Sequence, residues 1–468
     1  MPDGQPLDWS VAELVDAYRR REVSPVEVAR TALDRIAALD DRVHAFVTVD
    51  EAMTMTQARE SEHRYGVGVA RVLEGVPVSV KDAFHLRGLR TTLGSLVHRD
   101  DVSSDDSGVV RRMRAAGAVF TGKTNTAEFG QSATTDNLLG PDTGNPWDPT
   151  RTAGGSSGGA AASVAAGMSM VAVGSDGGGS VRIPASFCGL FGLKPTRGRC
   201  PDEDGFRAMT EFVSPGPLAR TAADARALFE VLAERTFART PLARLRIGLC
   251  LRPEDRPVHP GVADAVQRAA RLLEDAGHRV EAVDLPIAGW LDVFGPLVLD
   301  DEARERSHLL AQPEMLTTYE RRSLEAARTL DPHEVERARH ALPVYRQRIS
   351  DLFLTHDVLL TPTTAVPAFE LGRRPREIDG ERVDALWGAF PFTAPFNVAG
   401  TPAATVPVGL VDGLPVGAQL VTPMHTDALV LSLAEQLEEL VDFDRSPLLH
   451  PWRDAVVGNE SRRAAASS

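Results

Sequence analysis

The segment from Gly154 to Ser180 constrains the fold of this 468-residue chain more than any other part of the sequence. Residues 158–168 are a run of small residues typical of a helix, and residues 169–174 are an apolar run that predicts a buried strand. A helix of about ten residues rises about 15 Å, and a strand of about six residues returns about 20 Å. The chain therefore comes back near its starting point, and we expect Ser156 to lie close to Ser180.

The flanking sequence predicts an α/β protein with a helical lead-in. Residues 1–65 carry helical periodicity, and Ser24, Pro25 and Glu27 provide an N-cap, a proline at the first helical position and a glutamate at the third. From Gly75 onward, short β-branched runs alternate with glycine-rich turns and helices, which is typical of an α/β sheet domain. No internal repeat is visible.

A second α/β portion begins near residue 243. We expect charged helices over about 300–355 and a frayed polar tail at 459–468. The other elements expected from hydrophobic patterns are strands at 76–80, 118–121, 245–250, 279–284 and 357–362 and helices at 107–116, 261–276 and 426–440.

Composition excludes several classes of protein. The net charge of −14, from 65 acidic and 51 basic residues, disfavours a broad nucleic-acid-binding surface. Three cysteines are too few and too irregularly spaced for a disulfide framework or a zinc site. The N-terminus lacks the pattern of a secretory signal, and no apolar stretch is long enough to span a bilayer. We therefore expect a soluble cytoplasmic protein that binds neither nucleic acid nor membranes.

Residues 117–124, Gly-Ala-Val-Phe-Thr-Gly-Lys-Thr, match the phosphate-binding pattern G-x4-G-K-[ST] and raise the alternative of a P-loop-like nucleotide-binding protein. That pattern needs a strand before its first glycine, so that the residues between the glycines form an open loop around phosphate. Here a predicted helix precedes Gly117, and the intervening residues themselves form an apolar strand. This context argues against nucleotide binding.

Residues 154–158, Gly-Gly-Ser-Ser-Gly, match the nucleophile elbow of hydrolases that use a Ser-His-Asp triad. An elbow follows a buried strand, and the two prolines and the polar residues of 145–152 argue against such a strand. None of the twelve histidines stands in a distinctive setting. The elbow interpretation is therefore disfavoured.

Lys81, Ser156 and Ser180 suggest a different arrangement. A serine hydroxyl is a poor nucleophile until a base removes its proton, and a lysine that burial keeps neutral can be that base. On the strand at 76–80 the valines point to one face, which places Ser79 and Lys81 on the other. Lys81 is thus a candidate for a partly desolvated base, although a lysine at a strand end can also simply enter solvent.

Gly177, Gly178 and Gly179 directly precede Ser180. Residues without side chains allow backbone N–H groups to turn toward a substrate oxygen, where each donor stabilises developing charge by about 3 kcal/mol. Triple glycine is equally typical of a tight turn. The glycines alone leave both interpretations open.

Motifs in matching order and spacing over nearly the whole chain resemble the amidase signature family. The residues that carry the resemblance are Gly75-Val-Pro-Val-Ser-Val-Lys81-Asp82, Gly122-Lys-Thr-Asn125, Asn145-Pro-Trp147, Gly154-Gly-Ser156-Ser-Gly-Gly159, Gly174-Ser-Asp-Gly-Gly-Gly-Ser180-Val-Arg-Ile-Pro184, Phe187 through Pro195, Gly216 through Thr221 and Asn397 through Pro402.

The resemblance implies that Ser180 is the nucleophile, Ser156 a bridging serine that follows a cis peptide bond, and Lys81 the general base. Lys81 would take a proton relayed through Ser156 as Ser180 attacks the amide carbonyl. Ser156 would then protonate the leaving nitrogen, and water would release the acyl group from an acyl-enzyme. The N–H groups of residues 177–180 would form the oxyanion hole, Gly130 would lie beside the substrate, and no metal or organic cofactor is implied.

Similar proteins fold as one α/β/α unit around a large mixed twisted β-sheet, often as homodimers. The resemblance thus implies a single amidase domain over residues 1–468. Residues 66–242 would form the signature core that holds the triad, and residues 243–455 the second α/β portion. The boundary near residue 243 then becomes a subdivision of one domain.

Two departures from the family's usual motifs bear on function. Gly177 stands where threonine or isoleucine is more common, which could loosen the loop without removing an N–H donor. Residues 199–214 lack the Tyr-Gly-Leu…Ser-Ser-Leu-Asp-Gln stretch of the glutaminase subunit of tRNA-dependent amidotransferases. We therefore expect a free-standing amidase for a small-molecule amide. The alternative within the family is that glutaminase subunit.

The sequence does not identify the amide. Phe206, Met209 and Phe212 indicate an apolar or aryl acyl group, unless they are core residues. The segments expected to shape the pocket are 129–136, 203–213 and 300–350.

Overall fold

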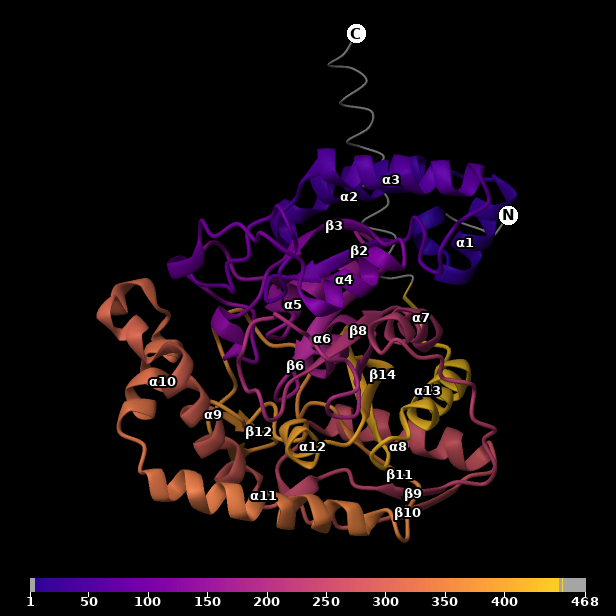
Figure 1. The fold of residues 1–468 in the computed structure, drawn as a ribbon. Helices are drawn as coiled ribbons and strands as arrows, with labels where there is room; N and C mark the ends of the chain where they lie inside the picture. The colour runs from indigo at the N-terminus through magenta and orange to yellow at the C-terminus, as the bar shows by residue number, and fades with distance from the viewer. Residues whose placement is uncertain (1–4, 446–447, 449–468) are drawn as a thin grey trace.

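The computed structural model describes residues 5–445 and residue 448. Its N-terminal part is helical, as predicted, and forms a layer at one end of the molecule (indigo in Figure 1). Ser24 and Glu27 form a complete capping box at the start of the second helix. The three helices are α1 (Val11–Arg20), α2 (Pro25–Val43) and α3 (Glu51–Gly66).

Within the described residues, eleven strands form one mixed sheet in the order β1-β3-β2-β6-β8-β7-β14-β15-β11-β9-β10. β2 is parallel to β3 and to β6, whereas β8 is antiparallel to both of its neighbours. The strands are β1 (Phe46–Thr48), β2 (Pro77–Lys81), β3 (Val119–Thr124), β6 (Val171–Asp176), β7 (Phe191–Lys194), β8 (Ser214–Ala219), β9 (Arg246–Leu249), β10 (Arg279–Ala282), β11 (Val358–Pro362), β14 (Ala403–Val411) and β15 (Leu414–Val421).

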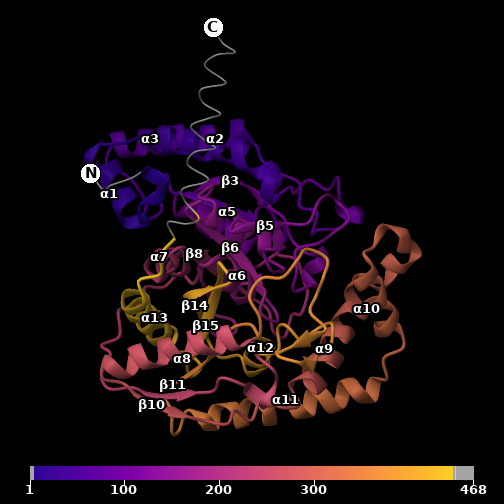
Figure 2. The same ribbon diagram turned by 180° about the vertical axis from the view of Figure 1, so that it is seen from behind.

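Helices cover both faces of this sheet (Figures 1 and 2). Side chains alternate along a strand, so Val171 and Val173 of β6 join one apolar core while Ala172 joins another. α5 (Gly158–Ala165) supplies the second core. The first core includes residues of α4 (Gly108–Ala115), α7 (Ala222–Leu232), α8 (Pro260–Asp275) and α13 (Asp427–Val441). The predicted α/β/α class with a large mixed sheet is confirmed.

The sheet continues across the predicted subdivision near residue 243. β7 of the first portion pairs with β14 of the second, with Lys194 opposite Ala403. The strands of both portions therefore share one hydrogen-bonded ladder.

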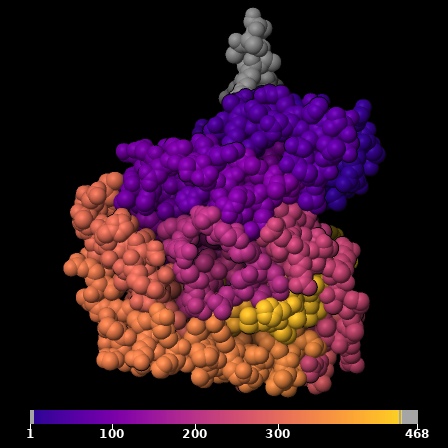
Figure 3. All heavy atoms as spheres, viewed as in Figure 1, coloured from indigo at the N-terminus to yellow at the C-terminus, as the bar shows by residue number. Residues whose placement is uncertain are grey.

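The charged helices predicted for 300–355 form a segment along one side of the molecule (orange in Figure 1). It begins earlier than predicted, at Trp290, and consists of α9 (Trp290–Arg306), α10 (Thr318–Arg328) and α11 (Pro332–Leu352). The space-filling view shows this segment packed against the N-terminal half (Figure 3). It supplies one wall of the cavity described below.

Residues 145–152 differ from the prediction. β4 (Gly144–Asn145) and β5 (Asp148–Thr152) pair as a separate two-stranded ribbon. Four of the five β5 residues are at least partly exposed, so the ribbon can accommodate Pro149 and is not the buried strand of a nucleophile elbow.

Cys188, Cys200 and Cys250 are each buried and form no disulfide. No helix in the described part is long and apolar enough to cross a membrane. The predicted frayed tail, 459–468, lies outside the described residues.

Short elements complete the described structure. They include α6 (Arg182–Cys188), α12 (Ala394–Ala399), β12 (Glu377–Ile378) and β13 (Glu381–Arg382).

Candidate active site

Lys81 is the last residue of β2 and is fully buried. β6 runs parallel beside β2, with Val80 opposite Val173, so the carboxyl ends of both strands meet at one edge of the sheet. Lys81 Nζ lies 2.6 Å from Ser156 Oγ and 2.9 Å from Ser175 Oγ. The amine therefore contacts two hydroxyls in an enclosed position and does not reach solvent.

Burial lowers the pKa of the Lys81 amine to about 7, and the Asp176 carboxylate opposes this effect only in part. An ordinary lysine has a pKa of about 10.4 and keeps its proton at neutral pH. At pH 7 a large share of Lys81 therefore carries the neutral amine. A neutral amine at hydrogen-bonding distance from a hydroxyl can accept its proton.

Ser156 stands in a tight turn before α5, and the peptide bond between Gly155 and Ser156 is cis, as the resemblance implies. The turn is closely packed: a Cβ on Gly155 would lie 2.4 Å from the backbone carbonyl carbon of Thr134. Thr135 Oγ1 accepts a hydrogen bond from Gly158 N–H at 2.9 Å. The segment around Thr134 thus holds the turn that presents the Ser156 hydroxyl to Lys81.

Ser180 follows the glycine loop that leaves β6, and it is 9% exposed. Ser157 N–H donates to Ser180 O at 3.2 Å, which ties together the two turns that carry the serines. Ser156, Ser175 and Ser180 line the same small cavity. Ser180 Oγ makes no hydrogen bond to any described residue. The chain thus returns over residues 156–180 as the spacing predicts.

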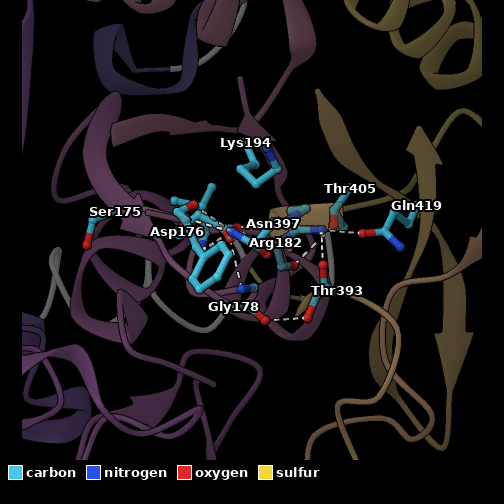
Figure 4. A network of polar contacts seen from close by, with 12 residues as sticks. Ser175, Asp176, Gly178, Arg182, Lys194, Thr393, Asn397, Thr405 and Gln419 are labelled. Carbon is cyan, nitrogen blue, oxygen red and sulfur yellow. Dashed lines mark hydrogen bonds and ion pairs between the residues drawn. The ribbon is translucent and has the colours of Figure 1, made fainter. Parts of the chain in front are cut away.

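A buried ion pair supports the glycine loop. Asp176 and Arg182 are both inaccessible to solvent and lie 2.9 Å apart (Figure 4). Arg182 also donates to Gln419 Oε1 at 2.6 Å, to Thr393 O at 3.0 Å and to Asn397 Oδ1 at 2.5 Å. Burial alone would raise the pKa of Asp176, but Arg182 and Asn397 hold it well below its ordinary value. Asp176 is therefore ionised at neutral pH.

One of the N–H groups predicted to form the oxyanion hole already donates a hydrogen bond within the loop. Gly179 N–H donates to Asp176 Oδ1 at 2.8 Å, so it is not available to a substrate oxygen. Gly179 has a φ of +129°, and a Cβ there would lie 2.2 Å from Thr393 Oγ1, so the position requires glycine. The predicted donors that make no hydrogen bond to any described residue are the N–H groups of Gly177, Gly178 and Ser180.

Two cavities share Gly130, Ser180 and Met209 in their walls. The larger has a volume of about 1100 Å³ and the smaller about 330 Å³. Gly178 lines the larger cavity, and Ser156 and Gly177 line the smaller. An amide placed on Ser180 would therefore have space on both sides of its C–N bond.

The predicted pocket segments contribute unequally. Residues 130–136 line the larger cavity, and a Cβ on Gly130 would lie 3.5 Å from Ser156 Oγ. Phe206 lines the smaller cavity. Phe212 is a core residue that stacks on Phe294 with ring centroids 5.1 Å apart.

Sequence reasoning missed three contributors to the site. Ser175 lies within the quoted motif, but nothing in the pattern indicated that its hydroxyl reaches Lys81. Residues 291–299 of α9 and residues 369–387 also line the larger cavity. These residues lie far from the serine motifs along the chain, so no local sequence pattern connected them with the site.

The phosphate-binding pattern at 117–124 is not a phosphate-binding loop. Residues 119–124 are the buried strand β3, and α4 precedes them, as the sequence context predicts. Lys123 Nζ lies 2.7 Å from an Asp82 carboxylate oxygen and donates to Thr91 Oγ1 at 2.7 Å. Its charge is neutralised within the fold, which excludes the nucleotide-binding alternative for this segment.

Removing the Ser175 hydroxyl is expected to reduce activity without abolishing it. In Ser175→Ala, Lys81 loses one of its two hydroxyl contacts, and a hydrogen bond worth about 1–2 kcal/mol corresponds to a roughly tenfold lower kcat. Steady-state kinetics would check this, with the exposed Ser104→Ala as the control. Unchanged kcat in Ser175→Ala would show that the contact does not position the amine.

Comparison with protein families matches the amidase family model to residues 27–431. The chain belongs to the amidase family. The resemblance drawn from the sequence motifs is thereby confirmed, and the protein is a hydrolase of carbon–nitrogen bonds in amides.

Relatives within this family have several activities. The chain is 35% identical to an indoleacetamide hydrolase of Bradyrhizobium diazoefficiens, over 93% of this chain and 87% of the relative. It is 33% identical to a glutamyl-tRNA(Gln) amidotransferase subunit of Carboxydothermus hydrogenoformans, over 93% of this chain and 98% of the relative. A bacterial aryl acylamidase of the amidase signature family superposes with a TM-score of 0.85 at 28% identity, covering 96% of this chain and 98% of that structure.

Proposed function

We propose that this protein hydrolyses a small-molecule carboxylic amide through an acyl-enzyme, with Ser180 as nucleophile, Ser156 as proton relay and Lys81 as general base. The observation that carries the proposal is the 2.6 Å contact between the buried Lys81 amine and Ser156 Oγ, at the wall of the small cavity that Ser180 also lines. The likeness to an indoleacetamide hydrolase and an aryl acylamidase supports an amide with an aromatic group.

In the proposed reaction, Ser180 Oγ bonds to the amide carbonyl carbon while its proton passes to Ser156 and the Ser156 proton passes to Lys81. The carbonyl oxygen becomes an oxyanion that faces the free N–H groups of the glycine loop. The C–N bond then breaks as Ser156 protonates the leaving nitrogen. A water molecule then gives up a proton through the same relay and attacks the carbonyl carbon of the acyl-enzyme. The bond to Ser180 Oγ breaks, which releases the carboxylic acid and restores the Ser180 hydroxyl.

The two cavities suggest an orientation for the substrate. Ser156, which protonates the leaving nitrogen in this mechanism, lines only the smaller cavity. The leaving group therefore faces the smaller cavity, and the acyl group extends into the larger one. Phe294 and Trp387 line the larger cavity and offer aromatic surface to the acyl group.

Activity is expected to depend on pH through Lys81. The neutral amine is the active form, so kcat/KM should rise as pH increases through about 7 and level off above it. Measurement of kcat/KM from about pH 5 to about pH 9 would show this inflection.

Lys194 offers a matched control, because burial also lowers the pKa of its amine to about 7. Lys194 donates to Pro195 O and is not part of the proposed relay. The kcat/KM of Lys194→Met, measured against pH, should still show the inflection near pH 7. Loss of the inflection in this variant, or a flat profile in the wild type, would contradict the assignment to Lys81.

A panel of amides tests the proposed function. We expect the wild type to release amine or ammonia faster from aryl amides than from aliphatic or amino-acid amides. The relative from C. hydrogenoformans favours glutaminase activity as a second candidate, so glutamine belongs in the panel. Turnover of glutamine alone would favour that candidate.

Homodimer formation and a cytoplasmic location stay predictions.

A further inference from the structure

The larger cavity carries an excess of positive charge in a protein whose net charge is −14. Two aspartates in its wall, Asp136 and Asp142, are outnumbered by arginines. The arginines that line it are Arg322 of α10 and Arg373, Arg374 and Arg376 of the segment before β12. The proposed reaction on a neutral amide uses none of these side chains.

Only part of this charge is neutralised by direct ion pairs within the fold. Arg373 pairs with Glu370 at 2.8 Å. Among the described residues, Arg322, Arg374 and Arg376 have no carboxylate within 4.0 Å. Arg322 and Arg376 are exposed to solvent. Arg374 is partly enclosed, and the Asp136 carboxylate acts on it only from across the Ser132 and Thr134 hydroxyls that both side chains contact. A partly enclosed guanidinium without a directly paired counter-ion is costly, and a bound anion lowers that cost.

Arg374 is the most enclosed of the three unpaired arginines, and it lies next to the catalytic turn. It donates to Ser132 Oγ at 2.5 Å and to Thr134 Oγ1 at 2.9 Å, in both cases through Nη2. The Thr134 backbone packs on Gly155, which precedes Ser156. Arg374 Nε and Nη1 make no hydrogen bond to any described residue, so two nitrogens stay available to a ligand.

Apolar surface in the same cavity lies against the glycine loop. A Cβ on Gly178 would lie 3.2 Å from Trp387 Cη2 and 3.5 Å from Phe294 Cζ. The two rings are perpendicular, with centroids 5.8 Å apart. An acyl group bonded to Ser180 therefore meets aromatic side chains in a cavity whose wall also holds the arginines.

From this arrangement we infer that the enzyme selects amides whose acyl group carries an aromatic ring and a carboxylate, with the ring on Phe294 and Trp387 and the carboxylate on Arg374. Arg322 and Arg376 add to the positive potential of the cavity. A guanidinium can donate two parallel hydrogen bonds to a carboxylate, which adds orientation as well as affinity. The inference rests on the proposed function, because it assigns the acyl group to the larger cavity.

Arylboronic acids test this inference without a known leaving group, because boron bonds to a nucleophilic serine. The inhibition constants of 3- and 4-carboxyphenylboronic acid would be compared with those of the 3- and 4-methyl analogues. The wild type should bind the better carboxylated compound about tenfold more tightly than its methyl analogue, the effect of one charge-assisted contact. Arg374→Gln should lose this preference, and Arg374→Lys should keep part of it.

Arg382→Gln is the control, since Arg382 is exposed on β13 and does not line the cavity. It should keep the wild-type preference. Equal binding of carboxylated and methyl compounds by the wild type would overturn the inference, as would equal weakening of both by Arg374→Gln, which indicates that Arg374 only holds Ser132 and Thr134. Failure of all four compounds to bind through Ser180 would overturn the proposed nucleophile as well.

Discussion

Replacing Ser180 by alanine is expected to lower kcat/KM for amide hydrolysis by about 10⁶-fold, because the acyl-enzyme cannot form without its hydroxyl. The fold should be unaffected. Ser180 Oγ makes no hydrogen bond to any described residue, so its removal leaves no buried partner unsatisfied. Steady-state kinetics on the best amide of the panel, together with a urea unfolding curve, would measure both effects.

Ser104→Ala is the matched control for this substitution. Ser104 is exposed, and its hydroxyl donates only to the neighbouring Asp105. The control should retain wild-type kcat/KM. Comparable activity in Ser180→Ala and the wild type would rule out Ser180 as the nucleophile, whatever the geometry around it.

Replacing Arg182 by alanine should produce the largest loss of stability. The substitution leaves the ionised Asp176 buried and unpaired, and breaking a buried ion pair in this way costs about 3–5 kcal/mol of unfolding free energy. It also removes the contacts to Thr393 and Asn397, which join α6 to the start and interior of α12, and to Gln419 of β15. The free energy of unfolding in urea would measure the effect.

An exposed ion pair provides the comparison for Arg182. Arg19 lies 2.8 Å from Asp16 on the surface of α1, at nearly the same separation as the buried pair. Arg19→Ala should change the unfolding free energy by less than about 1 kcal/mol, because solvent screens the pair. A similarly small change in Arg182→Ala would mean that the network in Figure 4 does not stabilise the loop.

The α/β class and the closeness of Ser156 to Ser180 could be predicted because the determining signals are local, whereas the single large mixed sheet and the roles of the site residues were implied only by the resemblance in motifs. The helix and strand between Ser156 and Ser180 have lengths that almost cancel, so the spacing alone brings the two turns together. The alternation of residues 76–80 correctly separates Lys81 from the valines of the same strand. Capping by Ser24 and Glu27 likewise depends on neighbours in the sequence.

What could not be predicted depends on contacts between distant segments. The partner of the Gly179 N–H is set by the geometry of the loop around Asp176, which a run of glycines does not reveal. The arginines near residue 374 join the cavity because their segment packs beside β5, where Leu371 N–H donates to Thr150 O. The ribbon strand at 148–152 was missed because proline excludes a buried ladder position but not an exposed one.

Covalent labelling with a fluorophosphonate, followed by peptide mapping, tests the central claim most directly, because it finds an activated serine without a known substrate. We expect a single modified peptide with the phosphonate on Ser180. Labelling should decrease below about pH 7 as Lys81 takes up a proton. Modification of Ser156 or another serine, or equal labelling of Ser180→Ala, would contradict the assignment of Ser180 as the nucleophile.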